Sequence, residues 1–184
     1  MRNSFGILQS GIHWEWFKAR CSTLGAGFRY TSDTVFDTFP WPQFEVSRDD
    51  REGGEGKKKT SQPSRPSRDS LEKIRAVGEA AVALRALRHE IMQDNGWSLR
   101  ELYKSLETPG ENRLRAAQAA LDAAVRRAYG MKPDEDILAF LLKLNLELAD
   151  KETKGEPIAP PGLPKNYPDP QKLVTEDCIK PQIL

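Results

Sequence analysis

The sequence predicts a mainly α-helical protein with a small β element. Between residues 69 and 150, four stretches carry apolar residues at spacings of three and four, which is typical of helices packed on one face. A similar pattern near the N-terminus precedes a short run of aromatic and β-branched residues, typical of strands. The expected order is an N-terminal helix plus a β-hairpin, a linker, a four-helix C-terminal bundle and an extended tail.

Length, charge and cysteine content restrict the possible classes. The 184 residues suit one ordinary domain or two small ones. With 28 Lys and Arg against 27 Asp and Glu, any surface for nucleic acid must be local. No apolar run reaches the roughly 20 residues that span a bilayer, and the first residues do not resemble a signal peptide, so we expect no membrane association and a cytoplasmic location. Cys21 and Cys178 suggest neither a disulfide framework nor a zinc site.

The N-terminal segment is expected to contain one helix and one hairpin. A helix is predicted over residues 4–22, with Asn3 or Ser4 as its cap. Residues 28–31 and 35–39 are predicted to be two neighbouring strands. The apolar face of the helix is predicted to comprise Phe5, Leu8, Ile12, Trp16 and Ala19.

Composition changes suggest four parts of the chain. Residues 1–46 hold the helix and hairpin, and residues 47–69 form a linker rich in Gly, Pro, Ser and charge. The linker has two interpretations, a solvated tether, which we favour, and an arm that contacts phosphates. Residues 70–150 form the helical part, and residues 151–184 form a proline-rich extended tail.

Residues that favour helix ends separate the four predicted C-terminal helices. Asp69 and Glu72 resemble a capping box at the start of the first helix, which should stop at Gly96. Ser98 and Glu101 repeat the box before a short second helix. The third should end at Gly130. The fourth, over residues 134–149, is apolar on more than half of its circumference, so its neighbours or another chain should bury it.

Catalytic motifs for methyl transfer are missing from the sequence. Methylation of a flipped base needs a glycine-rich donor turn and an Asn/Asp-Pro-Pro-aromatic loop. The pair Pro160 and Pro161 has neither the polar nor the aromatic neighbour. We assign no catalytic residue and no metal ligand, and interpret His13 and His89 as packing or surface residues. By itself the chain is therefore expected to bind or to scaffold, and its own enzymatic activity stays an open question.

Two ordered stretches resemble a known family. FGILQSGIHWEWFKAR, at residues 5–20, and FRYTSDTVFDTFPWP, at residues 28–42, resemble the end of the target-recognition region in MmeI-like type II restriction-modification enzymes and their adenine-methyltransferase relatives. LDAAVRRAYG, at residues 121–130, and DILAFLLKLN, at residues 136–145, more weakly resemble the helical C-terminal domain of those enzymes. Residues 1–46 would then be the end of a target-recognition domain.

The resemblance implies a DNA target-recognition or scaffolding fragment or subunit of an adenine-specific DNA methyltransferase in a phage-defence system. Its partners would be double-stranded DNA and a catalytic methyltransferase polypeptide that binds S-adenosylmethionine. The chain would be a split-gene subunit, a truncated reading frame or a cloned fragment. The alternative is a helical protein–protein interaction subunit of a methyltransferase-containing defence complex, without direct DNA contact. An exposed N-terminal edge, left by a missing upstream sheet, would bind either the partner or a second copy in a homodimer.

The resemblance also implies a set of DNA-facing residues. Arginine there could contact guanine or phosphate, and hydroxyl groups could contact phosphate. The competing interpretation is a small aromatic core of Tyr30, Phe36, Phe39 and Trp41, with Arg29 simply exposed or stacked on it and the polar face of the helix solvated. The candidate DNA-binding residues are Lys18, Arg20, Arg29, Tyr30, Thr31 and Ser32.

Overall fold

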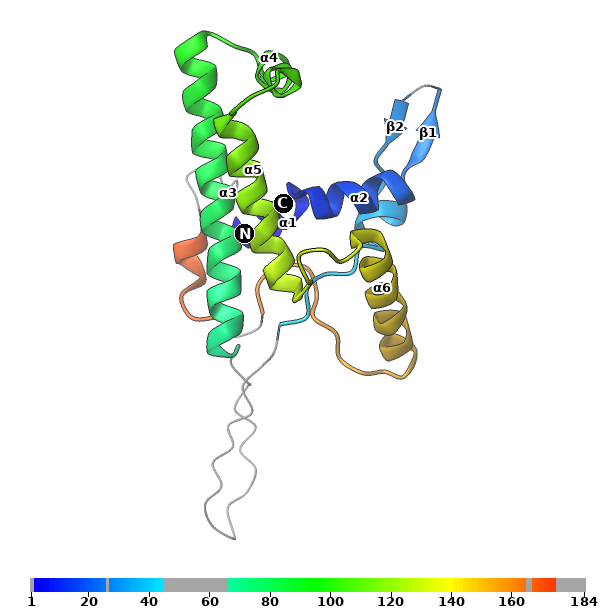
Figure 1. Ribbon diagram of the computed structural model, residues 1–184. Coiled ribbons are helices and arrows are strands. Elements are labelled where there is room, and N and C mark those ends of the chain that lie inside the picture. The colour runs from blue at the N-terminus through cyan, green and yellow to red at the C-terminus, as the bar shows by residue number, and fades with distance from the viewer. Residues whose placement is uncertain (1, 26, 45–65, 165–166, 175–184) are drawn as a thin grey trace, which may run out of the picture.

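Helices dominate the chain, and a two-stranded antiparallel hairpin is its small sheet, so the predicted fold class is confirmed. The computed structural model describes residues 2–25, 27–44, 66–164 and 167–174 (Figure 1). In chain order the elements are α1 (Arg2–Leu8), α2 (Gly11–Arg20), β1 (Ser22–Leu24), β2 (Gly27–Arg29), η1 (Ser32–Phe36), α3 (Arg68–Asn95), α4 (Leu99–Lys104), η2 (Ser105–Glu107), α5 (Arg113–Tyr129), α6 (Ile137–Thr153) and η3 (Pro170–Leu173). No helix in the described ranges is both long enough and apolar enough to cross a membrane.

The single N-terminal helix predicted over residues 4–22 is wrong, because the chain bends between α1 and α2. Buried Ser10 accounts for the break. Its hydroxyl donates to the carbonyl of Ile7 at 2.7 Å and accepts from the backbone N–H of His13 at 3.4 Å. A serine that bonds the backbone on both sides ends one helix and caps the next. Neither Asn3 nor Ser4 is a cap, since both lie inside α1.

Side chains from α3 and α5 hold this bend. The backbone N–H of Gly11, at the start of α2, donates to Asp122 Oδ1 on α5 at 2.8 Å. Gln118 Nε2 donates to the carbonyl of Gln9 at 3.2 Å and to Asp122 Oδ1 at 3.1 Å. Arg88 Nη1 on α3 donates to Gln9 Oε1 at 2.7 Å. The direction of α2 is therefore set by residues more than 75 positions away in the sequence.

Helix α1 packs closely against α3 at Gly6. A Cβ at this position would lie 2.9 Å from Val77 Cγ1 and 3.0 Å from Ala81 Cβ. Both of these α3 residues are buried. Glycine is therefore needed at this position for the close approach of the two helices.

The hairpin lies earlier in the chain than predicted. Strands β1 and β2 pair antiparallel, with Ser22 opposite Arg29. The strand expected at residues 28–31 forms only in part, as β2, and the one expected at 35–39 does not form, because Ser32–Phe36 is a π-helical turn instead. Val35 and Phe39 are buried whereas Asp37 between them is exposed. A strand would place these three residues on one face, so burial of this segment requires helical spacing.

All four predicted C-terminal helices form. Gly96 and Gly130, with φ of 64° and 72°, end α3 and α5 in the left-handed conformation, as predicted. Ser98 and Glu101 form the predicted capping box of α4.

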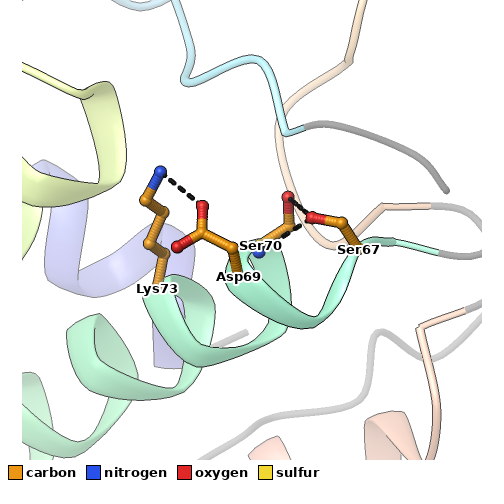
Figure 2. Close-up of polar contacts among 4 residues, drawn as sticks. All are labelled: Ser67, Asp69, Ser70 and Lys73. Carbon is orange, nitrogen blue, oxygen red and sulfur yellow. Dashed lines mark hydrogen bonds and ion pairs between the residues drawn. The ribbon is translucent and has the colours of Figure 1, made fainter.

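The cap of α3 is two residues earlier than the predicted Asp69. Ser67 Oγ accepts from the backbone N–H of Ser70 at 3.1 Å and donates to Ser70 Oγ at 2.9 Å (Figure 2). Asp69 lies in the first turn, where its carboxylate pairs with Lys73 Nζ at 2.7 Å (Figure 2). The sequence pattern located the start of the helix but assigned the capping role to the wrong side chain.

The packing of the fourth helix differs from the predicted bundle. Helices α3 and α5 lie side by side and antiparallel, with α1 against them, whereas α6 packs on α2 (Figure 1). Asn145 Nδ2 on α6 donates to the carbonyl of Thr38 at 2.8 Å, and Tyr129 on α5 donates to the carbonyl of Pro40 at 2.8 Å. The N-terminal segment and the helical part thus share one core, in which Trp16 and Phe39 cluster with α5 residues. The domain boundaries remain a prediction.

Described residues after α6 run back along the N-terminal segment. The side chain of Gln43 accepts from the backbone N–H of Ala159 at 2.8 Å and donates to the Ala159 carbonyl at 3.4 Å. Farther on, η3 follows Asp169. The predicted linker lies outside the described residues, apart from 66–69.

We predict that Gly6→Val lowers the free energy of unfolding by at least about 1 kcal/mol, because the new methyl groups overlap Val77. Chemical denaturation of the single and double variants measures this. Val77→Ala should cost less stability in the Gly6→Val background than in the parent chain. Equal costs in both backgrounds would contradict the close approach.

Asp122→Ala is expected to lower the free energy of unfolding by about 1 to 3 kcal/mol, because it leaves the start of α2 without a charged acceptor. Asp150→Ala is the matched control, since Asp150 forms an exposed ion pair with Lys154 and should cost less than about 1 kcal/mol. If thermal or urea unfolding finds equal losses, Asp122 does not anchor the bend.

Candidate nucleic-acid interface

The hairpin projects from the far end of α2, away from the α3 and α5 pair (Figure 1). All three residues of β2 are exposed. The hairpin therefore lies at the surface, although the residues that form its strands differ from those expected. A short protruding ribbon is an element of the size that can enter a DNA groove.

The two sides of β2 have different surroundings. Phe28 and Tyr30 both contact Phe17 on α2, with ring centroids 5.8 and 5.6 Å apart. Successive side chains of an extended chain point to opposite sides, so Arg29 points away from α2. It forms no ion pair with any acidic side chain of the described ranges. Among the three candidate cations Lys18, Arg20 and Arg29, all of them described, only Arg29 is exposed and has no charged or aromatic partner.

Tyr30 is anchored by a buried histidine. Its hydroxyl lies 3.2 Å from His13 Nε2, and the His13 ring packs edge-on against Phe39 at 4.6 Å. His13 is 5% exposed, and burial lowers its pKa from 6.5 to about 4. Burial and, second, the charge of Asp37 raise the pKa of Tyr30. Both groups are therefore neutral at pH 7, and His13 packs in the core as predicted.

Thr31 and Ser32 continue from the hairpin into η1. The hydroxyls of Thr31 and Thr34 are hydrogen-bonded to each other. Ser32 is exposed at the start of η1. Asp33 and Asp37 are exposed on the same segment and add negative charge. This part of the surface can offer hydroxyl groups to DNA but is not a uniform phosphate-binding patch.

The two cationic side chains of α2 each already interact with a neighbouring side chain. Lys18 Nζ pairs with Glu15 at 2.8 Å, and the Arg20 guanidinium lies over the Trp16 ring at 5.7 Å from its centroid. Both side chains are exposed in the last turn of α2, just before the hairpin. The six predicted residues therefore lie on one continuous segment, but Arg29 and Tyr30 point in different directions.

An aromatic patch next to this segment was not predicted. It comprises Trp14, Phe17, Phe28 and Tyr30, linked by ring contacts of 5.1 to 6.4 Å. Trp14 and Phe28 are 49% and 61% exposed. Trp14 falls outside the apolar face expected for the first helix, and an aromatic residue on the polar face was the signal that could have revealed the patch. The alternative aromatic core exists in part, since Trp41 contacts both Phe36 and Phe39, whereas Tyr30 is linked to Phe39 through His13.

The profile of the family described as "MmeI, target recognition domain" matches residues 2–43, which contain α1, α2, the hairpin and η1. This match makes residues 2–43 an MmeI-like target-recognition segment. This segment is called the MmeI-type segment below.

Two longer proteins resemble more of the chain. DNA methyltransferase A of Bacillus subtilis (strain 168) is 30% identical over 149 residues, which are 79% of this chain and 13% of that protein. The structure of the type IIL restriction-modification enzyme MmeI in complex with DNA matches 82% of this chain and 16% of its own, with 26% identity and a TM-score of 0.58. Both matches extend well beyond the MmeI-type segment, so the helical part resembles these enzymes too. The chain spans less than a fifth of the length of either relative.

The buried His13 should make stability depend on pH. Because its folded pKa is about 4 and its unfolded pKa about 6.5, the unfolded state binds more protons between these values. Stability should be fully present above pH 6.5 and fall by about 2 to 3 kcal/mol toward pH 4. Urea unfolding at pH 7 and pH 4.5 measures the loss.

His13→Gln should remove most of this loss, and His89→Gln, which changes an exposed histidine, should retain it. Identical pH profiles for the parent chain and His13→Gln would contradict burial of a neutral imidazole.

Proposed function

We propose that this chain is the DNA target-recognition and scaffolding part of an adenine-specific DNA methyltransferase from a restriction-modification system. The observation that carries the proposal is the match of residues 2–43 to a target recognition domain. Support also comes from the two relatives, one named a DNA methyltransferase and the other a restriction-modification enzyme in complex with DNA. A role in phage defence and a cytoplasmic location belong to the same proposal.

Arg29 is proposed as the principal DNA contact. Its planar guanidinium suits bidentate contact with guanine O6 and N7, or with a phosphate. The ring contacts of Phe28 and Tyr30 with Phe17 fix the hairpin on α2, so that little ordering is needed on binding. Thr31 and Ser32 are proposed to offer hydroxyl groups to the backbone. Lys18 and Arg20 are proposed as peripheral phosphate contacts, weakened by their present partners.

The transfer chemistry is proposed to lie in the remaining part of such an enzyme. S-adenosylmethionine and the flipped adenine would be held there. The role of the present chain is to keep the hairpin in a fixed orientation on the helical part through Asp122 and Gln118. Positioning of this kind is what a recognition element must supply, since base contacts depend on register along the duplex.

Two copies of the chain are proposed to form a homodimer, as an alternative to association with the catalytic polypeptide. The hairpin has two strands and thus two outer edges, neither paired with a third strand in the described ranges. Such an edge can add a strand from another chain, whether a second copy or the catalytic polypeptide.

Binding of duplex DNA at several salt concentrations tests the proposal. The purified chain should bind weakly, with log affinity falling linearly as log salt rises. Mixed with the methyltransferase polypeptide of its source, it should restore methylation of adenine. No shift of DNA at low salt together with a tight, salt-insensitive complex would instead support the protein–protein interaction subunit.

Arg29→Ala should weaken duplex binding by about 1 to 3 kcal/mol if it reads a base, with loss of discrimination at one position. If it contacts a phosphate, the salt slope should fall by about 1. Arg100→Ala changes an exposed arginine on α4 and is the matched control, with no expected effect. Equal binding by the parent chain and Arg29→Ala would remove Arg29 from the interface.

A further inference from the structure

A groove of about 650 Å³ lies between the MmeI-type segment and the helical part. Its sides come from Leu8, Trp14 and Tyr30 on one side and from Tyr103, Leu106 and Leu114 on the other. We propose that this groove seats an apolar element of the remaining polypeptide of an MmeI-type enzyme, supplied within one chain or by a second one. The inference rests on the proposed function and adds a protein partner surface to it.

The exposed side chains around the groove are those of protein interfaces. Trp14, Tyr30 and Tyr103 are 49%, 48% and 41% exposed, and Phe28 beside them is 61% exposed. Tryptophan and tyrosine are enriched in the centre of interfaces, where they provide most of the binding energy. Exposed apolar patches of this kind mark sites of association. The size of the groove fits a few side chains inserted from one face of a helix or strand.

The charges of the groove disfavour nucleic acid as its occupant. Arg88 is the one cation among its lining residues, and it already bonds Gln9 at 2.7 Å and lies over the Tyr103 ring at 5.5 Å. Asp122, also in the lining, would repel a phosphate. Single-strand binding surfaces combine aromatic residues with several free cations. Here the aromatic residues are present and the free cations are not, so a protein element fits better.

Two observations indicate which protein occupies the groove. The relatives carry more than four fifths of their length outside the matched region, and that length supplies candidate elements to occupy the groove. One side of the groove belongs to residues 2–43, the part that matches a target recognition domain. An occupant from the same enzyme would complete the recognition unit and fix its orientation to the helical part. Hydrogen bonds from Gly11 to Asp122 and from Gln118 to Gln9 join the two sides of the groove. The groove is therefore already formed before the occupant binds.

The test measures binding between the 184-residue chain and a probe polypeptide. The probe comes from the same source and corresponds to the part of DNA methyltransferase A that this chain does not match. Affinity is measured by titration calorimetry in 0.5 M NaCl and without DNA, which removes the contribution of phosphate contacts. The parent chain should bind. Trp14→Ser combined with Tyr103→Ser should weaken binding at least 100-fold. Leu142→Ser, which alters a 50% exposed leucine on α6, is the matched control and should change binding less than twofold.

Circular dichroism of each variant confirms folding, and Tyr103→Ser alone is a milder variant should the double variant unfold. No complex with the probe, or a complex unaffected by the groove variants, would overturn the proposal. Loss of binding in Leu142→Ser would assign the contact to α6 instead. Duplex binding by the groove variants separates the two claims. If the parent chain binds DNA but forms no complex with the probe, the groove inference fails and the proposed function stands. If Tyr103→Ser loses DNA binding alone, the groove is a nucleic-acid site and this inference is wrong.

Discussion

The arrangement of this molecule depends on one bend, at Gln9, Ser10 and Gly11. The Asp122 carboxylate accepts the N–H of Gly11 at the positive end of α2, and Gln118 bonds the carbonyl of Gln9. These contacts satisfy backbone groups that a helix break leaves without partners. They also turn α2 away from α3 and α5, toward the side where the hairpin and α6 lie (Figure 1). Without the bend, neither the hairpin nor the groove would be placed where it is.

The consequences for recognition follow from α2. Its face toward the core carries His13 and Trp16, which pack with Phe39, and its other aromatic residues support the hairpin. Arg29 is thereby held on the outer side of β2, exposed, while Tyr30 is fixed on the inner side. A cation on a pre-ordered ribbon loses little entropy on contact with DNA. The groove is lined by Trp14, Phe17 and Tyr30 of this same segment, so the surface proposed for protein adjoins the surface proposed for DNA.

Local signals in the sequence were sufficient for several helix ends of the helical part. Ser98 with Glu101, Gly96 and Gly130 specify helix ends through contacts within a few residues, and they are found where the pattern predicts them. The break at Ser10 could not be predicted in this way, because Asp122 and Gln118 that support it are over 100 positions away. The π-helical turn at residues 32–36 was mistaken for a strand for a similar reason. Burial of Val35 in a shared core decides its conformation, whereas its β-branched composition favours a strand.

The candidate site, too, could be predicted only in part from the sequence. The resemblance to MmeI-like enzymes makes the segment from Lys18 to Ser32 a candidate, but it does not predict the side to which each residue points. That depends on the pairing of β2 with β1 and on the stacking of Tyr30 against Phe17. The groove could not be predicted at all, since its two sides are distant in sequence and meet only through the bend.

A nuclear magnetic resonance titration of the labelled chain with duplex DNA at low salt tests the central claim most directly. The account predicts that backbone amide shifts change along the end of α2, the hairpin and the start of η1, and that they stay constant in α3 and α6. Changes confined to the helical part, or spread evenly over the surface, would contradict it.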